Sequence, residues 1–210
     1  MYQLTKKRMV VALHQLAGRD ELMATLFSQY GVPPLLSRSE SFATLVHIVL
    51  EQKVSLTSAA AIMRRVEKAC PGMQPDKFLV TEELRLRDAG MSQSKVTYCR
   101  SIAQNLVSKN LSLQALRKLD DEQVIETLTQ VRGIGPWTAG VYLMMAMRRA
   151  DAWASGDRAL LVSYAESADL KTMPDYSQLD SIASQWTPHR GTAARLLWHA
   201  YLEKRNRDAC

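Results

Sequence analysis

Apolar residues recur at helical spacing along nearly the whole chain, and this feature most constrains what the chain can fold into. In the segment 42–50, for example, the apolar positions include Phe42, Leu45, Val46, Val49 and Leu50. Residues three or four apart lie on the same face of an α-helix, whereas a half-buried strand needs strict alternation. The pattern therefore predicts an all-α protein.

Helix boundary signals agree with this prediction. Ser92 stands before a helix expected over 94–109, and Asp120 with Gln123 has the spacing of a capping pair. Residues typical of breaks interrupt the helical pattern at 31–34, 71–75 and 172–174. The chain of 210 residues, with 47% hydrophobic and 23% charged residues, is ordinary for a globular protein and long enough to bury a good core.

The net charge of +6 favours an anionic partner, although many proteins with this balance bind no nucleic acid. The cysteines, Cys70, Cys99 and Cys210, are odd in number and far apart, which fits neither a disulfide framework nor zinc-ligand spacing. The four histidines show no ligand spacing either. Apolar runs are too short to span a bilayer, and residues 1–7 lack an apolar signal core. We therefore expect a cytoplasmic protein that is neither secreted nor membrane-bound.

A short turn, Gly133-Ile134-Gly135, leads into Pro136, which suits the first helical position because no amide donor is needed there. Glycine permits a positive φ and lets an anionic backbone approach the main-chain amides closely. Asp157 follows the helix that Pro136 opens, directly after Gly156. The segment thus predicts a phosphate-binding turn that lies a fixed distance from one carboxylate.

Three segments resemble one family of DNA repair enzymes, in order and in spacing. Residues 131–139 with Gly156-Asp157 resemble the helix-hairpin-helix and Gly/Pro-Asp signature of base-excision DNA glycosylases. Segment 42–55 resembles the family segment that ends in Gln-Gln-x-Ser or Gln-Leu-Val-Ser, and segment 186–198 resembles the family's C-terminal block from Trp to Leu-Trp. Three collinear motifs are far more specific than a lone Gly-x-Gly. The chain most resembles 3-methyladenine DNA glycosylase II, over roughly residues 40–202.

The resemblance implies one glycosylase unit over residues 1–210, with two lobes and the active site in the cleft between them. Residues 40–125 would form a central lobe, and residues 1–39 with 126–210 would form the second lobe, which would carry hairpin 129–137 and Asp157. We expect no extra N-terminal β domain, and no iron–sulfur cluster because closely spaced cysteines are lacking. The implied partner is damaged double-stranded DNA, bound by a monomer that is nucleoid-associated if the source is bacterial.

Cleavage of an N-glycosidic bond builds positive charge on the deoxyribose, so a fixed carboxylate near the sugar stabilises the transition state. The resemblance assigns this catalytic role to Asp157. Opposite unit charges about 4 Å apart attract by roughly 4 kcal/mol at an effective dielectric of 20, before desolvation costs. An alkylated purine already carries positive charge and leaves without a dedicated general acid. An Asp after a Gly is otherwise most often a turn residue or a helix N-cap, and this is the alternative for Asp157.

Relatives that also cut the DNA strand carry a nucleophilic Lys where this chain has Trp137, and an indole cannot form a Schiff base. The resemblance therefore implies a monofunctional enzyme without AP lyase activity. Trp137 and Trp198 match aromatic positions of the family's base pocket, where an indole face attracts a cationic base by about 0.5 to 2 kcal/mol. Each Trp could instead be a core residue, and for Trp153 and Trp186 we prefer the core interpretation.

The resemblance also places the hairpin on the DNA. Gly133, Gly135 and Thr138 would bind a phosphate 3′ of the lesion, without reading sequence. The main-chain carbonyls of Thr129, Val131 and Gly133 would hold a monovalent cation, Na+ or K+. No other cofactor is implied.

Gln52 and Lys53 occupy the positions with which relatives wedge into or probe the duplex. Lys53 departs from the Leu or Gln that is common there. Its methylene stem can fill part of the gap while its ammonium reaches a phosphate, or it can be a plain surface lysine. Ser55 and Arg158 are further candidate DNA contacts, and Arg158 could alternatively help keep the Asp157 carboxylate ionised.

The leading interpretation is an enzyme that flips alkylated purines out of duplex DNA and excises them in base excision repair, with 3-methyladenine as the first substrate and 7-methylguanine as the second. One alternative keeps the mechanism but takes deaminated or mismatched bases such as uracil or hypoxanthine, whose neutral edges need amide or acidic groups in the pocket. Another alternative is a hairpin DNA-binding module without catalysis, which is favoured if Asp157 points away from the cleft.

Overall fold

The structure, a computed structural model, describes residues 3–205. Within this range thirteen helices follow one another, and the β contact found there is an isolated antiparallel bridge between Gln3 and Arg149. The all-α prediction is therefore confirmed for the described residues. In the same range, no helix has both the length and the apolar character that crossing a membrane requires.

The described chain divides into two compact units. The terminal unit contains residues 3–37 and 143–205, and the middle unit contains residues 38–142. The first boundary lies close to the one predicted after residue 39. The second lies after residue 142 rather than 125, so hairpin 129–137 belongs to the middle unit, and the prediction that placed it with the terminal segments is wrong. The reason is local contact, because Gln52 hydrogen-bonds to Gly133 and Tyr98 lies directly against it.

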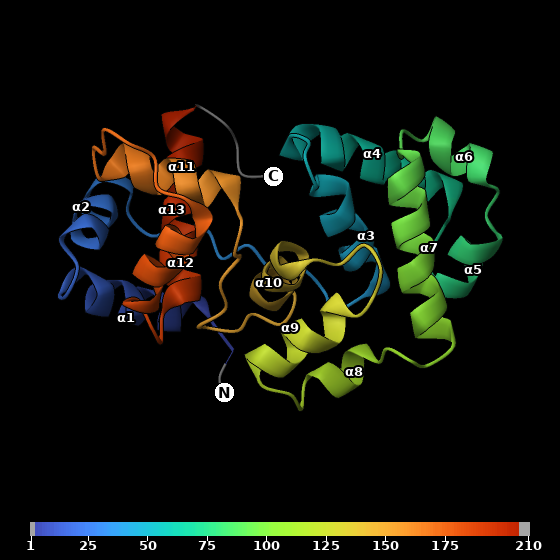
Figure 1. Cartoon of the computed structure of the whole chain (residues 1–210), viewed down its shortest axis with the longest axis horizontal. Coiled ribbons are helices and arrows are strands. Elements are labelled where there is room, and N and C mark those ends of the chain that lie inside the picture. The colour runs from blue at the N-terminus through green and yellow to red at the C-terminus, as the bar shows by residue number, and fades with distance from the viewer. Residues whose placement is uncertain (1–2, 206–210) are drawn as a thin grey trace. The chain divides into compact units, whose positions relative to one another are not determined.

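The terminal unit is built around one long buried helix. Its helices are α1 (Lys6–Ala17), α2 (Glu21–Tyr30), α11 (Arg158–Ser167), α12 (Tyr176–Ser184) and α13 (Arg190–Lys204) (Figure 1). α1, α2 and α11 each pack against α13, and α1 also packs against α2. Every residue from Gly191 to Leu197 is buried, so this stretch of α13 has no exposed face.

The middle unit packs its helices around α3 and α7. Its helices are α3 (Phe42–Glu51), α4 (Leu56–Ala69), α5 (Pro75–Val80), α6 (Glu83–Asp88), α7 (Gln93–Val107), α8 (Leu113–Leu116), α9 (Asp121–Thr129) and α10 (Pro136–Met145), whose last turn continues past residue 142. α3 packs against α4 and α7, and α7 packs against α5 and α6. Leu45, Val46, Val49 and Leu50 are all 0% exposed, as their helical spacing predicted.

The helices begin where short polar side chains can cap them. Side-chain oxygens of the N-cap residues accept a main-chain N–H at α1, α2, α3, α4, α7, α8, α9, α11 and α12. The predicted Asp120–Gln123 pair is a capping box, and Ser92 caps α7 as expected. Each such cap stabilises its helix by about 1 kcal/mol.

The two cysteines in the described range, Cys70 and Cys99, are free and buried, whereas Cys210 lies outside that range. Burial raises the pKa of the Cys99 thiol far above its usual range. Among residues 3–205, no group of three or more His, Cys, Asp and Glu side chains is placed to hold a metal ion.

The hairpin turn needs glycine at one of its two glycine positions for a steric reason. Gly133 has φ +99°, and a Cβ added there would lie 2.3 Å from Tyr98 Cβ. Gly135 lacks a positive φ of this kind, and no heavy atom lies within 4 Å of where its Cβ would be. The positive φ expected of the turn is therefore confirmed at Gly133 alone, while Gly135 leaves open space.

Gly133→Ala should destabilise the protein by about 3 kcal/mol, because strain at positive φ adds to a clash with the backbone-proximal part of Tyr98. Gly135→Ala should change the free energy of unfolding by less than about 1 kcal/mol. Urea denaturation of the two variants measures the difference. Equal stability of both variants would contradict the packing described for the turn.

Candidate functional site

The hairpin joins α9 to α10 through a tight turn. Val131 N donates to Leu128 O at 3.1 Å, and Ile134 N donates to Val131 O at 3.0 Å. Val131 and Ile134 are buried, so their side chains anchor the turn from below. Pro136 begins α10, as the sequence predicted, and the amides of the first turn of α10 carry the positive end of the helix dipole. A helix start beside an open glycine is suited to bind a phosphate.

Gln52 holds this hairpin in place. Its Nε2 donates to Gly133 O at 3.1 Å and to Thr138 Oγ1 at 3.0 Å, so one amide bridges the turn and the first turn of α10. The predicted role of Gln52 as a wedge or probe is corrected by this geometry, because the end of its side chain is turned into the unit. The residue left for that role is Lys53.

The side chain of Thr138 is turned into the unit, and its phosphate contact stays a prediction. Its side chain is 1% exposed, and its hydroxyl accepts the Gln52 amide hydrogen. A phosphate contact by the hydroxyl is therefore excluded in this conformation, and any such contact falls to the main-chain amide of Thr138 in the first turn of α10.

Lys53 stands out in the loop between α3 and α4. Its side chain is exposed, and its φ is +59°, which is uncommon for a residue with a Cβ. Ser55, the other predicted contact in this loop, is exposed and caps α4 by accepting Ser58 N at 3.2 Å. The loop therefore presents Lys53 on a backbone that both neighbouring helices fix.

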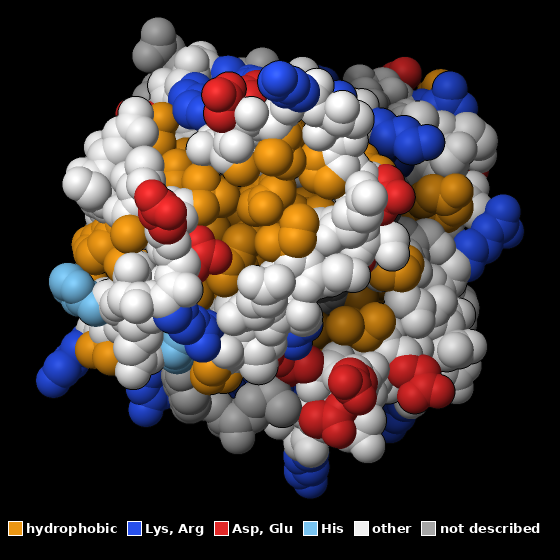
Figure 2. All heavy atoms as spheres, turned by 60° about the vertical axis from the view of Figure 1, so that its left-hand side comes forward, with side chains coloured by type: hydrophobic (Ala, Val, Ile, Leu, Met, Phe, Trp, Pro, Cys, Tyr) orange, Lys and Arg blue, Asp and Glu red, His pale blue; other side chains and the backbone are white. Residues whose placement is uncertain are grey.

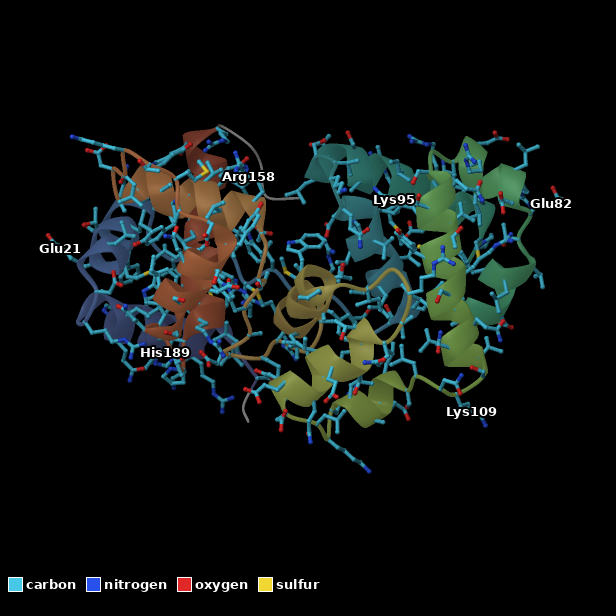
Figure 3. All side chains as sticks on the ribbon, viewed as in Figure 1. Glu21, Glu82, Lys95, Lys109, Arg158 and His189 are labelled. Carbon is cyan, nitrogen blue, oxygen red and sulfur yellow. The ribbon has the colours of Figure 1, made fainter. Side chains whose placement is uncertain are left out.

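Lys95 supports this loop from α7. Its Nζ donates to Leu50 O at 2.8 Å, in the last turn of α3 (Figure 3). Burial lowers the pKa of Lys95, and its ion–dipole contact with the end of α3 suits the negative end of the helix dipole. No sequence pattern indicated this role, because a lysine in an amphipathic helix is ordinarily solvated.

The carbonyls predicted to hold a cation come from the same hairpin. Val131 O accepts Ile134 N, and Gly133 O accepts Gln52 Nε2. A carbonyl oxygen has two lone pairs, so each of these two can also face a cation, and main-chain oxygens suit a hard monovalent ion. The donor set fits Na+ or K+, and cation binding at Thr129, Val131 and Gly133 stays a prediction.

Asp157 lies in the terminal unit and is 8% exposed. It is the N-cap of α11, and its Oδ1 accepts Leu160 N at 2.9 Å and Trp198 Nε1 at 3.2 Å. The cap that sequence reasoning gave as the alternative is therefore present. It does not exclude the catalytic role, because a carboxylate accepts about four hydrogen bonds. The structure brings together two predicted site residues, Asp157 and Trp198.

Arg158 lies next to Asp157 at the start of α11, with an exposed side chain (Figure 3). Its Nη1 lies 3.3 Å from Met173 Sδ, in the loop that precedes α12. The guanidinium is thus directed toward residues 172–174 in this conformation. Its exposure leaves the prediction of a DNA phosphate contact standing.

The four tryptophans were predicted to be either core residues or base-pocket residues, and two of these predictions can be compared with burial. Trp153 and Trp186 are 8% and 1% exposed, which confirms them as core residues. Their rings lie 5.8 Å apart, and Trp186 Nε1 donates to Asp20 Oδ2 at 2.7 Å. Trp198 is half-buried beside Asp157, and Trp137 is half-buried in the first turn of α10. The base-pocket role of these last two stays a prediction.

Two further polar residues of the terminal unit, one buried and one half-buried, make contacts that were not predicted. Arg195 is 1% exposed, donates to Gly191 O and Met144 O, and has its pKa lowered to about 10 by burial. Asp180 accepts the indole N–H of Trp153 at 2.8 Å. Charged residues at helical spacing predict a solvated face, so the sequence alone pointed away from these interior roles.

Charge on the visible surface is spread rather than concentrated. Figure 2 shows Lys and Arg side chains distributed around the face in view, with Asp and Glu side chains among them. On that face, Lys and Arg side chains therefore do not form one basic band. Any grip on DNA there depends on local groups more than on a broad field.

The features described so far define a helix-hairpin-helix protein. The described chain is helical, it carries a glycine-bearing hairpin, and a carboxylate caps a later helix. A family model described as HhH-GPD superfamily base excision DNA repair protein matches residues 46–189, more than half of the chain. The chain therefore belongs to the HhH-GPD superfamily of base excision DNA repair proteins.

Named relatives agree with this membership. DNA-3-methyladenine glycosylase 1 of Schizosaccharomyces pombe is 27% identical over 193 residues, which cover 87% of this chain and 83% of that protein. The crystal structure of a DNA-3-methyladenine glycosidase from Bacillus halodurans has a TM-score of 0.76 at 26% identity, over 98% of this chain and 95% of that one. An S. pombe 3-methyladenine DNA glycosylase in complex with abasic DNA shares the fold, with a TM-score of 0.84 at 24% identity over 92% and 96% of the two chains.

Gln52→Ala should lower the free energy of unfolding by about 2 kcal/mol, because Gly133 O and Thr138 Oγ1 lose a shared donor inside the unit. Gln52→Glu should cost more, since a carboxylate would face the Gly133 carbonyl. Lys53→Ala is the matched control in the same loop and should change stability by less than about 0.5 kcal/mol. Thermal denaturation measures all three, and an unaffected Gln52→Glu variant would show that the bridge contributes nothing.

Proposed function

We propose that this protein is a monofunctional DNA glycosylase that hydrolyses the N-glycosidic bond of alkylated purines in duplex DNA. The proposed first substrate is 3-methyladenine, with 7-methylguanine as the second. The single observation that carries the proposal is the pairing of Asp157 with Trp198, a carboxylate held in place by an indole that can also line a base pocket. Membership of a base excision repair superfamily and similarity to proteins named 3-methyladenine glycosylases support it.

The carboxylate of Asp157 would act on the sugar. As the bond to the base breaks, positive charge grows at the anomeric carbon, and a fixed carboxylate stabilises this charge without reorganising. Attraction between unit charges at about 4 Å is roughly 4 kcal/mol at an effective dielectric of 20, which corresponds to nearly a thousandfold in rate. The cap and the indole N–H hold Oδ1 in one orientation, and this fixed orientation is what the electrostatic role needs.

The hairpin would grip the backbone of the damaged strand. Amides at Gly133, Gly135 and the start of α10 can donate to a phosphate, and the open space at Gly135 allows close approach. Na+ or K+ on the hairpin carbonyls would add positive charge beside that phosphate. Main-chain contacts of this kind carry no sequence information, which suits an enzyme that must search all DNA.

Lys53 would contact the duplex where the target nucleotide leaves the stack. Its positive φ costs of order 1 kcal/mol, and strain of this kind persists where the surrounding structure imposes it. The ordering of residues 52–55 by Gln52, Lys95 and Ser55 supplies that constraint. We assign the wedge or probe role to Lys53 alone.

Selectivity for a cationic base would come from indole faces. A cation over an indole gains about 0.5 to 2 kcal/mol relative to a neutral base, so an alkylated purine is favoured modestly over its unmodified form. The larger selectivity lies in the leaving group, because a purine that already carries positive charge departs without protonation. A pocket for uracil or hypoxanthine would need amide or acidic groups that read neutral base edges.

Asp157→Asn should keep binding to abasic DNA but lose at least about 100-fold in base release, because the amide removes the charge from the transition state. Asn is as good an N-cap as Asp, so α11 should remain folded. Single-turnover release of free base from methylated duplex, with uracil, hypoxanthine and undamaged duplexes in parallel, measures activity and substrate class together.

The outcomes of this assay separate the candidate functions. Release from methylated DNA alone supports the proposal, and release from uracil or hypoxanthine duplexes supports the second substrate class. DNA binding without release of any base identifies a non-catalytic module. Wild-type activity in Asp157→Asn overturns the assigned role.

The protein should leave the DNA strand intact after base release. Trp137 stands where lyases carry an amine, so borohydride should trap no covalent complex with DNA, and breaks should appear only after alkali. Denaturing gels with and without alkali measure this. Any borohydride-trapped complex would contradict the monofunctional assignment, and its loss in Lys53→Ala would identify Lys53 as the amine.

A further inference from the structure

The segment that delivers Asp157 to its position is tied down by one carboxylate from another helix. Asp180 lies on α12, and its Oδ1 accepts Trp153 Nε1 at 2.8 Å. Its Oδ2 accepts Ser155 Oγ at 2.5 Å. The two oxygens of one side chain thus bind two residues that flank Ala154, in the loop that leads into α11.

This loop ends in a turn that sets the position of Asp157. Asp157 N donates to Ala154 O at 3.2 Å, and Gly156 has φ +82°, so residues 154–157 form a tight reversal of the chain. The tether at Trp153 and Ser155 lies directly before this reversal. Only Gly156 separates Ser155 from Asp157, so a shift of Ser155 is passed directly to Asp157.

Apolar packing also holds the loop just before the turn. Trp153 packs against Trp186, and Ala154 is 1% exposed. These apolar contacts allow small sliding, because they have no preferred hydrogen-bond direction. The paired bonds to Asp180 do have direction, and the bond to Ser155 fixes the main chain nearest to Asp157.

We propose that Asp180 is a positioning residue for the reaction, which holds the turn 154–157 so that Asp157 faces the sugar of the flipped nucleotide. This inference rests on the proposed catalytic role of Asp157. Asp180 itself does not touch the substrate, and its role is carried by two hydrogen bonds and not by its charge. A misplacement of about 1 Å at a catalytic group can cost on the order of 100-fold in rate.

Asp180→Ala tests the tether and Asp180→Asn tests its chemistry. The alanine variant removes both acceptors and should lower the single-turnover rate of base release by about 10- to 100-fold, with affinity for abasic DNA unchanged. The asparagine variant can accept from Trp153 with its oxygen and donate to Ser155 with its amide, because a hydroxyl both donates and accepts. Its rate should stay close to that of the wild type, within about threefold.

Ser155→Ala and Trp153→Phe each remove one of the two hydrogen bonds to Asp180 and so measure their separate effects on the rate. Loss of the Ser155 hydroxyl should lower the rate more than loss of the indole N–H, since Ser155 lies nearer to the turn. These two variants also keep the proposal testable if Asp180→Ala does not fold. Rates are compared per folded protein, with the folded fraction measured by thermal denaturation.

Asp20→Ala is the matched control. Asp20 also accepts an indole N–H, from Trp186 at 2.7 Å, and it caps α2 in the same unit without touching residues 153–157 through a hydrogen bond. It should lower the melting temperature as much as Asp180→Ala, yet leave the single-turnover rate within about twofold.

Each result either supports or overturns the positioning role of Asp180. A slow Asp180→Ala beside an active Asp180→Asn and an active Asp20→Ala supports the positioning role. Equal slowing in Asp180→Asn and Asp180→Ala, or equal slowing in Asp20→Ala, overturns it. Asp157→Asn run in parallel separates the two claims: its loss of activity with a fully active Asp180→Ala rejects only the positioning role, whereas its full activity rejects the proposed function.

Discussion

The hydrogen bonds that converge on Asp157 Oδ1 are the interaction on which the site depends. One comes from the main chain of α11 and the other from Trp198, so a single oxygen links the start of one helix to the middle of another. α11 and α13 pack against each other along this contact, and α13 is buried in its first two turns. Asp157 is 8% exposed, and burial of a carboxylate without hydrogen-bond donors costs free energy. These two N–H partners therefore allow the ionised side chain to be buried at this position.

In the middle unit, the main chain of the hairpin turn is held rigid by contacts from outside the turn. The amides at the start of a helix cannot pair within that helix, so the turn that carries them must be braced by other means. Here the brace is one glutamine amide, buried apolar residues under the turn, and a glycine against which Tyr98 packs. The same glutamine ends α3, so the hairpin and the loop of Lys53 share one support.

Local sequence signals predicted the helices well and the tertiary roles poorly. Periodicity, caps and the Gly-Ile-Gly-Pro turn act over a few residues, and they placed α7 close to its observed bounds and located the starts of α9 and α10. Gln52 meets the hairpin across a large sequence separation, and Asp180 meets Trp153 in the same way. Such pairs depend on how helices pack. For this reason the inward contacts of Gln52 and the contacts of Asp180 were not predicted.

Burial of the Cys70 and Cys99 thiols affects how the protein reacts with methylating agents. Methylating electrophiles attack thiolates far faster than thiols, and a thiol whose pKa is raised by its apolar surroundings stays protonated. The pKa argument applies to Cys99, and for both Cys70 and Cys99 burial limits access by the reagents that would generate this protein's proposed substrates. At these two positions, the packing that stabilises the middle unit also shields it chemically.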